Sequence, residues 1–283
     1  MMPRTVFTAI FSFWVLLSAG QSIEDTYRFA ENQFEAGNFH AALIDYQRVA
    51  FFDSESEFED IYHRIGDLFY ATGEFGSAVR NYDIATRVEK NDSIKTEIRL
   101  KKVLCFFKQN NYFFALNELL SISPPQNQFI QNKVNLYTAI AWFGVEDYNQ
   151  SFSNLSKMLP DEEIPKLEEI FKQFEKTLKR FRPGKIETMS IIFPGLGQIY
   201  TGDIVSGINS VFLVGGLAVV GIWAWQTYGV IDALLSVGSW YYRYYTGGIQ
   251  NARGVALEKI VHEKEETYQQ IIQLVENNLS PNP

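Results

Sequence analysis

The stretch IFPGLGQIYTGD, residues 192–203, places three glycines and a proline in an apolar run, a composition found in loops that bind phosphate. The dinucleotide-binding fingerprint GxGxxG would require a glycine where Tyr200 stands, and no predicted strand precedes the segment. The lysine of a nucleotide-binding P-loop is also missing. The spacing therefore argues against both phosphate loops and leaves a turn or a membrane-related segment.

Metal-binding and nucleophilic residues are sparse. His40, His63 and His262 fall in no ligand-like spacing such as HExxH. Cys105 is the single cysteine, which excludes an internal disulfide framework and a multi-cysteine metal site. Because no nucleophile–base pair, metal cluster or phosphate loop emerges, we predict that the chain is not an enzyme and uses no metal or cofactor.

The composition limits the class of protein. The 283 residues suffice for one large domain or two modest ones, and 46% hydrophobic residues with a net charge of −8 predict a packed structure. An acidic chain without a basic stripe argues against nucleic acid as a partner, because the phosphates would be repelled.

Residues 1–20 look like an export signal. Arg4 supplies a short positive start, residues 5–17 form an uncharged core, and residues 18–20 are small enough for cleavage. The core is too short to span a bilayer comfortably, which favours a removable signal over an anchor. A buried N-terminal helix is the alternative. We expect the mature chain to begin near residue 21.

A period of 36 or 37 residues runs through the first half of the chain. The segment GNFHAALIDYQRVA at 37–50 aligns with GEFGSAVRNYDIAT at 73–86, and the frame recurs more weakly at 110–122 and 146–158. The aromatic residues after each turn are 36, 37 and 36 residues apart: Phe39, Phe75, Tyr112 and Tyr148. Self-similarity at such a period predicts stacked supersecondary units.

This pattern resembles the tetratricopeptide repeat, a pair of antiparallel helices, over residues 23–158. In the first two units the small and aromatic positions match the family: Ala30, Ala42, Tyr46, Ala50, Gly66, Ala78, Tyr82 and Ala85. The last two units depart from it at Val103, Asn110, Ile122, Glu146, Ser151 and Met158. The resemblance implies an all-α repeat domain of about four repeats at 21–160, in which small residues let helices approach closely.

The resemblance also implies a binding surface, since the first helices of such repeats line a concave face that binds a protein or peptide. The residues carried over to this face are Tyr27, Glu31, Phe34, Glu35, His63, Asp67, Tyr70, Leu104, Phe107, Leu136, Ile140 and Phe143. Acidic residues lie in the first two repeats and apolar residues in the last two, so we expect a partner with one basic and one apolar end. Core packing is the alternative role for each aromatic residue.

Residues 161–185 are predicted to form one amphipathic helix. Its apolar residues recur at steps of three and four: Ile164, Leu167, Phe171, Phe174, Leu178 and Phe181. We expect this helix to cap the repeats, because a stacked array exposes its last face. Its basic end is either a solvated helix terminus or a juxtamembrane patch that attracts anionic lipid headgroups.

Residues 186–248 are predicted to form a membrane domain. No charged residue occurs from 204 to 231, and 204–226 is long enough to cross a hydrocarbon core as a helix. After a turn at 226–229, a second apolar helix is expected at 230–245, and its aromatic end is typical of a lipid–water boundary. A buried helix of a soluble protein is the alternative for the first crossing.

Two charges flank this second apolar segment. Asp232 and Arg243 lie eleven residues apart, which places them on one face of a continuous α-helix. A charge within a membrane is a functional candidate, but both lie near helix ends, where water or headgroups solvate them. We therefore interpret them as boundary residues.

The stretch at 192–203 is then a short helix at the membrane boundary, wedged against the hairpin. Pro194 should break the helix, Gly195 and Gly197 should permit close backbone contact, and Gln198 should cap the freed polar groups. Its PGxGQxYxG signature resembles that of small bacterial membrane domains of undefined function over about 190–250, which implies no activity. The signature residues are Pro194, Gly195, Gly197, Gln198, Tyr200, Gly202 and Asp203.

Residues 249–283 are predicted to hold a separate amphipathic helix at 249–278 and a short tail. The glycines at 247 and 248 should separate this helix from the hairpin. Two membrane crossings would return it to the side of the repeats.

Together these features predict a membrane-anchored scaffold that binds a partner protein or peptide through the concave face and contacts membrane lipid. The alternative is a homo-oligomeric membrane component, associated through the glycines of the hairpin, that assists transport or envelope assembly with the repeats as regulator. The signal segment predicts repeats on the periplasmic side of a bacterial envelope, whereas basic residues at both hairpin ends favour the cytoplasm.

Overall fold

The computed structural model describes residues 22–54 and 57–279. Within these ranges every regular element is helical and none is a strand, which confirms the predicted all-α class. The predicted export signal at 1–20 lies outside the described residues. The chain divides into two compact units between Met158 and Leu159.

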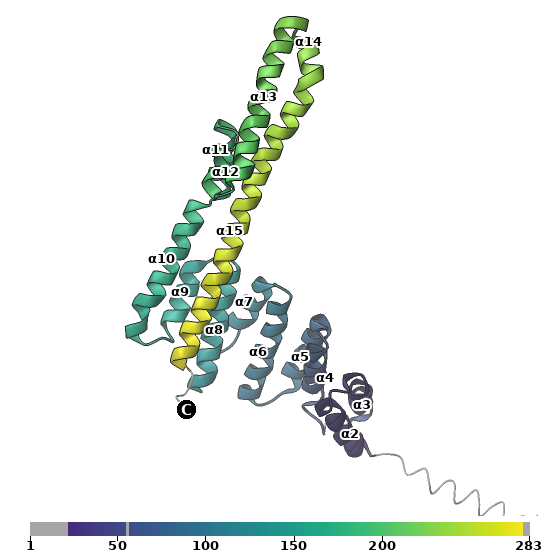
Figure 1. Ribbon diagram of the computed structural model, residues 1–283. Helices are drawn as coiled ribbons and strands as arrows, with labels where there is room; N and C mark the ends of the chain where they lie inside the picture. The colour runs from purple at the N-terminus through teal and green to yellow at the C-terminus, as the bar shows by residue number, and fades with distance from the viewer. Residues whose placement is uncertain (1–21, 55–56, 280–283) are drawn as a thin grey trace, which may run out of the picture. The chain divides into compact units, whose positions relative to one another are not determined.

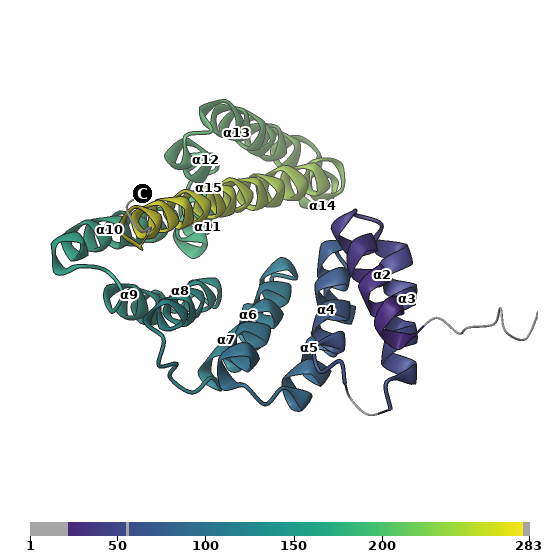
Figure 2. The same cartoon turned by 90° about the horizontal axis from the view of Figure 1, so that it is seen from below.

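The N-terminal unit is a succession of helix pairs (Figures 1 and 2). The pairs are α2 (Ile23–Glu35) with α3 (Phe39–Phe52), α4 (Ile61–Ala71) with α5 (Phe75–Val88), α6 (Asp92–Lys108) with α7 (Tyr112–Leu120), and α8 (Gln128–Gly144) with α9 (Tyr148–Ser156). Each helix packs against the next one in the chain. The sequence period therefore marks sequentially packed helix pairs.

The turn inside each pair explains that period. The four periodic aromatic residues are the first residues of the second helices, α3, α5, α7 and α9. Two residues before each of them the backbone takes a positive φ: 77° at Gly37, 80° at Gly73, 54° at Asn110 and 68° at Glu146. The last two pairs thus keep a left-handed turn without glycine. This backbone conformation costs a residue with a Cβ about 1–2 kcal/mol, and it costs asparagine less.

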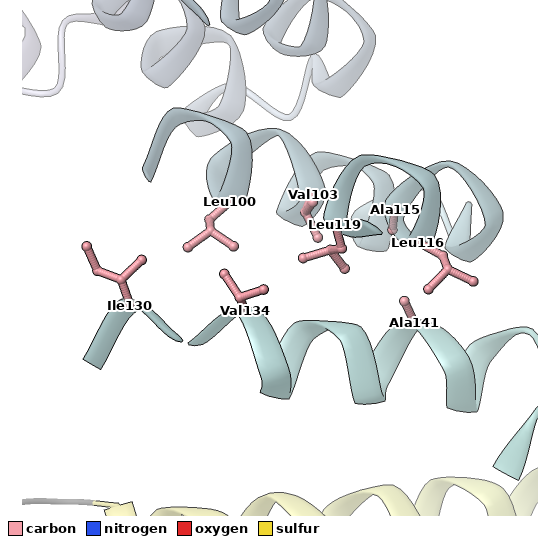
Figure 3. Packing of buried hydrophobic residues seen from close by; sticks show 8 residues of the cluster. All are labelled: Leu100, Val103, Ala115, Leu116, Leu119, Ile130, Val134 and Ala141. Atoms are coloured by element: carbon pink, nitrogen blue, oxygen red, sulfur yellow. The ribbon is translucent and has the colours of Figure 1, made fainter. Parts of the chain in front are cut away.

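Small residues bring the helices of the first two pairs together, as predicted. Ala30, Ala42 and Ala78 are fully buried, and a Cβ on Gly66 would lie 2.5 Å from Cε1 of Tyr82. In the third pair Val103 takes such a position within an apolar cluster that joins α6, α7 and α8 (Figure 3). The cluster contains Leu100, Val103, Ala115, Leu116, Leu119, Ile130, Val134 and Ala141.

The C-terminal unit is built along one long helix, α15. Its elements are a 3-10 turn (Asp161–Glu163), α10 (Ile164–Arg180), α11 (Pro183–Ile192), α12 (Leu196–Thr201), α13 (Ile204–Tyr228), α14 (Val230–Ala233), the π-helical segment Leu234–Gly238 and α15 (Ser239–Leu279). Figure 1 shows the other helices of the unit along α15, which packs against α10, α11, α12 and α13.

The amphipathic stripe of α10 is covered inside this unit. Leu167 and Phe174 are fully buried, and α10 packs against α15, on which Ile271 and Val275 are buried. That α10 caps the last repeat stays a prediction.

The prediction that Gly247 and Gly248 separate two helices is wrong, because α15 continues through both. The reason is a close helix contact. The carbonyl of Gly248 accepts a hydrogen bond of 2.8 Å from Nε2 of Gln198, and a Cβ on Gly248 would lie 2.7 Å from Oγ of Ser210. Glycine at 248 therefore permits α12 and α13 to approach α15.

One helix of the described residues is long and apolar enough to cross a membrane. This helix, α13, has 25 residues; its most apolar 18-residue window has a mean hydropathy of 2.0, and 11% of that window is buried. The predicted second crossing instead consists of α14, the π-helical segment and the start of α15, which pack back against α13. The structure thus supports one candidate span, and the second crossing remains a proposal.

Candidate functional site

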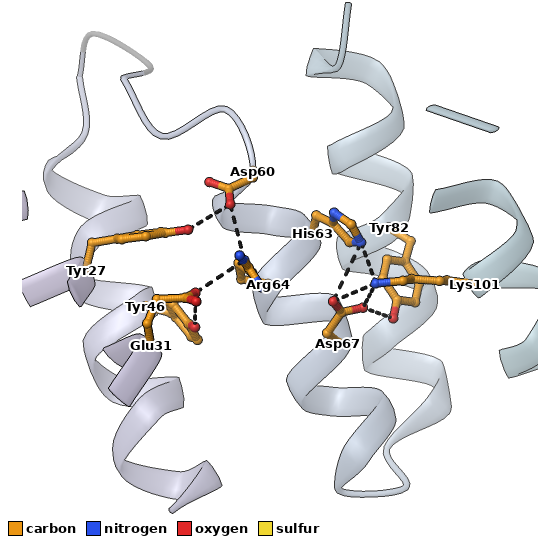
Figure 4. A network of polar contacts seen from close by, with 9 residues as sticks. All are labelled: Tyr27, Glu31, Tyr46, Asp60, His63, Arg64, Asp67, Tyr82 and Lys101. Carbon is orange, nitrogen blue, oxygen red and sulfur yellow. Dashed lines mark hydrogen bonds and ion pairs between the residues drawn. The ribbon is translucent and has the colours of Figure 1, made fainter. Parts of the chain in front are cut away.

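A cluster of polar side chains joins the first helix pair to the second (Figure 4). Tyr46, which is fully buried on α3, donates a hydrogen bond of 2.5 Å to Oε1 of Glu31 on α2. The same oxygen lies 3.2 Å from Nε of Arg64 on α4. Arg64 also donates to Asp60, which accepts a bond of 2.7 Å from the Tyr27 hydroxyl. Glu31 therefore links both helices of its own pair to the next pair.

A second cluster repeats this arrangement one unit later. Tyr82 donates to Oδ1 of Asp67 at 2.8 Å, and Nζ of Lys101 donates to the two carboxylate oxygens at 2.8 and 2.7 Å. The Lys101 ammonium also lies 2.8 Å from Nε2 of His63. We call each tyrosine–carboxylate–cation set a polar triad. Corresponding members are 36 or 37 residues apart: Glu31 and Asp67, Tyr46 and Tyr82, Arg64 and Lys101.

Burial controls the protonation states around the polar triads. Burial, together with the neighbouring carboxylate, raises the pKa of Tyr46 and of Tyr82 far above the usual range, so both hydroxyls stay protonated donors. Burial lowers the pKa of His63, and the charge of Asp67 opposes this shift. A neutral His63 can accept the hydrogen of Lys101 at Nε2.

The third repeat has no equivalent triad, because Leu104 and Leu119 stand where Asp67 and Tyr82 stand in the second. Leu119 belongs to the apolar cluster of Figure 3. The junctions between the early repeats therefore contain charges, whereas the junction between the third and fourth pairs is apolar.

Most aromatic residues predicted for the concave face pack inside their own repeat. Each of four contacts the aromatic residue that begins the next helix, with ring centroids 5.7, 5.6, 5.9 and 5.3 Å apart: Phe34 with Phe39, Tyr70 with Phe75, Phe107 with Tyr112, and Phe143 with Tyr148. These pairs follow the repeat period and so explain the residues as packing.

The other predicted residues divide into two groups. Tyr27, Glu31, His63 and Asp67 belong to the polar clusters of Figure 4. Because Arg64 and Lys101 already bind Glu31 and Asp67, these carboxylates are not free to meet a basic partner. Glu35 is exposed, and the apolar residues Leu104, Leu136 and Ile140 are partly buried on α6 and α8.

The PGxGQxYxG signature forms a tight junction around α12. Pro194 lies in the turn between α11 and α12, and Gly195 takes a φ of 90°. A Cβ on Gly195 would overlap the carbonyl oxygen of Gly207, and a Cβ on Gly207 would lie 2.5 Å from Cγ1 of Ile199. The close backbone contact predicted for Gly195 is confirmed.

The middle of the signature packs into the C-terminal unit. A Cβ on Gly197 would overlap Oγ of Ser190 and lie 2.8 Å from the carbonyl oxygen of Ile186. Gln198 is fully buried, and its amide donates a hydrogen bond to the carbonyl of Gly248 in α15. The sequence predicts instead that this amide caps polar groups freed by Pro194. That prediction is wrong because the side chain reaches a helix 50 residues away in sequence.

The end of the signature positions α12 and starts α13. The Tyr200 hydroxyl accepts a hydrogen bond of 2.8 Å from Lys185, which lowers the pKa of Tyr200. Gly202 ends α12 with a φ of 92°, and Oδ1 of Asp203 accepts a bond of 3.2 Å from the backbone N–H of Ser206. The signature residues therefore contribute to helix packing, to helix capping or, for Pro194, to the turn between α11 and α12.

Asp232 and Arg243, the two charges predicted at the membrane boundary, do not share one helix face. The π-helical segment between Asp232 and Arg243 interrupts the α-helical spacing on which their predicted shared face depended. Both side chains are exposed: Asp232 lies on α14, and Arg243 lies in α15 at an open pocket between α13 and α15.

The described ranges, 22–54 and 57–279, hold no group of three or more His, Cys, Asp or Glu residues placed to bind a metal ion. Comparisons with protein-family models, with curated proteins and with solved structures each found no match to this chain.

Proposed function

We propose that the chain is a membrane-anchored scaffold, with the helical hairpin of α13, α14 and the start of α15 as the anchor. The observation that carries the proposal is the surface of α13. Most of its large apolar residues are exposed instead of packed against other helices, with Phe212 76% exposed. Apolar patches of this extent on a protein surface mark contact with membrane or with other proteins.

The exposed apolar surface continues into the proposed second crossing. Ile231 and Leu235 are exposed, and the segment ends at the exposed aromatic residues Trp240, Tyr242 and Tyr244. Aromatic residues of this kind gather at lipid–water boundaries. These features support a second crossing that returns the chain to the side from which α13 entered.

In this proposal the N-terminal unit is a tetratricopeptide-like array that binds a partner protein or peptide. The helix pairs and their left-handed turns support the array. Since most of the predicted face is engaged in packing, we narrow the contact surface to Glu35, Leu104, Leu136 and Ile140. The export signal would place this surface in the periplasm of a bacterial envelope.

Site-specific photo-crosslinking in native membranes tests the scaffold. A photoreactive amino acid at Leu136 or Ile140 should give a discrete crosslinked product of the same mass. Matched positions on exposed second-helix surfaces, Arg80 and Asn149, should not give it. Equal products from both sets, or none from Leu136 and Ile140, would contradict the proposed surface.

A further inference from the structure

A pocket of about 630 Å³, open to the surface, lies between α13 and α15 of the C-terminal unit, and its wall includes polar side chains. Residues of α13 and α15 contribute hydroxyl, amide and guanidinium groups to its wall: Ser206, Asn209, Ser210, Arg243, Thr246 and Asn251. Polar groups are costly against hydrocarbon unless they find hydrogen-bond partners. Because these polar groups gather in one pocket beside a candidate membrane helix, they favour a ligand that carries a polar group.

Arg243 makes this cavity positive. The residues that line it include this cation and no carboxylate. The ion pairs of α15 join Arg253 to Glu187 and His262 to Glu266, and none in the described part of the chain involves Arg243. A guanidinium group surrounded by amides and hydroxyls suits the oxygens of a phosphate.

A second hollow, of about 280 Å³, follows between the same stretches of chain and is apolar. It is lined by residues that include Leu217, Gly221, Trp225, Leu234, Val237 and Tyr241. On α13 the residues Ser210, Leu213, Leu217 and Gly221 follow at steps of three and four, so they form one stripe that passes from the polar to the apolar hollow. Along this stripe the helix rises about 16 Å.

We propose that the two hollows bind one glycerophospholipid, with its phosphate at Arg243 and an acyl chain along the apolar hollow. The order of a polar and then an apolar hollow matches a headgroup and its tail. A free phosphate compound would leave the apolar hollow unused. The inference rests on the proposed membrane insertion of α13 and names the lipid class that this anchor binds.

Native mass spectrometry of the full-length chain in detergent tests the site. Three probes are titrated: phosphatidylglycerol, diacylglycerol with the same acyl chains, and sn-glycerol 3-phosphate. We expect a retained phosphatidylglycerol complex and weak binding of the other two probes. Arg243→Gln should weaken phosphatidylglycerol binding at least about tenfold, the loss of one charge-assisted contact. The control Arg253→Gln, on the same helix but outside the cavity, should stay within about twofold of wild type.

Several outcomes would overturn the site. Equal binding of diacylglycerol would remove the role of the phosphate, and equal binding of sn-glycerol 3-phosphate would identify a soluble ligand. Phosphatidylglycerol binding that is as tight in Arg243→Gln as in wild type would remove the role of Arg243. A wild-type chain that binds no phosphatidylglycerol would refute the site altogether. Because binding is measured in detergent, its loss leaves the anchoring of α13 unaffected. Conversely, release of the chain from membranes would refute anchoring without changing the lipid selectivity.

Discussion

The N-terminal repeats and the C-terminal unit can be compared by two roles of glycine, one at turns with a positive φ and one at close contacts between helices, and each unit contains both. In the repeats, Gly37 and Gly73 take a positive φ at turns, and a Cβ on either would meet no atom within 4 Å. In the C-terminal unit, a Cβ on Gly197, Gly207 or Gly248 would come closer than 3.0 Å to a neighbouring segment. Turn glycines direct the chain, whereas contact glycines set the distance between helices.

The two units also differ in where their apolar surface lies. The repeats bury even large aromatic residues such as Tyr46 and Tyr82, and polar triads satisfy their hydroxyl groups. In the C-terminal unit 11% of the apolar window of α13 is buried. This exposed surface of α13 is what the proposal of a lipid-covered anchor rests on.

The largest effect is expected for a contact glycine of the C-terminal unit. Gly197→Val should lower the free energy of unfolding by about 3 kcal/mol, because the new side chain would overlap Ser190 and the backbone of Ile186. Denaturation of the full chain in detergent measures this. The control Gly215→Val meets no atom within 4 Å and should change little. Equal losses would show that the close contact at Gly197 is not the cause of the destabilisation.

A contact glycine inside the repeats sharpens the comparison. Gly66→Ala should cost about 2 kcal/mol, because the buried ring of Tyr82 would have to move. In Gly76→Ala the nearest atom is Nη1 of Arg80 at 4.0 Å, so this variant should be neutral or slightly more stable. Urea unfolding of the N-terminal unit within the full chain checks both, and a neutral Gly66→Ala would contradict the packing.

The polar triads predict a smaller loss. Tyr82→Phe should destabilise the repeats by about 1.5 kcal/mol, because Asp67 loses a hydrogen bond to its charge. Tyr46→Phe should behave alike, since Glu31 loses the equivalent bond. The same urea titration measures both variants, and two unchanged midpoints would show that the triads do not stabilise the junctions.

The smallest expected effect is a pH dependence at the second triad. Burial lowers the pKa of His63 in the folded chain, so below its usual pKa of about 6.5 the unfolded chain binds the proton more readily. Stability should therefore fall as the pH decreases through this window. His63→Gln keeps an acceptor for Lys101 and does not titrate, so it should flatten the dependence. An identical pH profile in wild type and variant would exclude His63 as its source.

The repeat turns could be predicted from the sequence because they depend on local residues at a fixed period. The equivalence of Gly37 with Asn110 and Glu146 follows from alignment alone, and all take a positive φ. The polar triads were missed, although their members recur at the same period. Recognising them requires knowing that Arg64 in the second helix pair contacts Glu31 in the first.

The C-terminal unit was harder to predict because its contacts are distant in sequence. Gln198 binds the carbonyl of Gly248, and no local pattern relates the two residues. The helix break expected at 247–248 is absent, because α15 continues through both glycines and Gly248 instead permits the close approach of α13.

Alkaline carbonate extraction of membranes that contain the full chain tests the central claim most directly. If exposed α13 lies in lipid, the chain should remain in the membrane pellet and enter solution only with detergent. Recovery of the intact chain in the carbonate supernatant would show that protein, not lipid, covers α13, and would contradict the anchored scaffold.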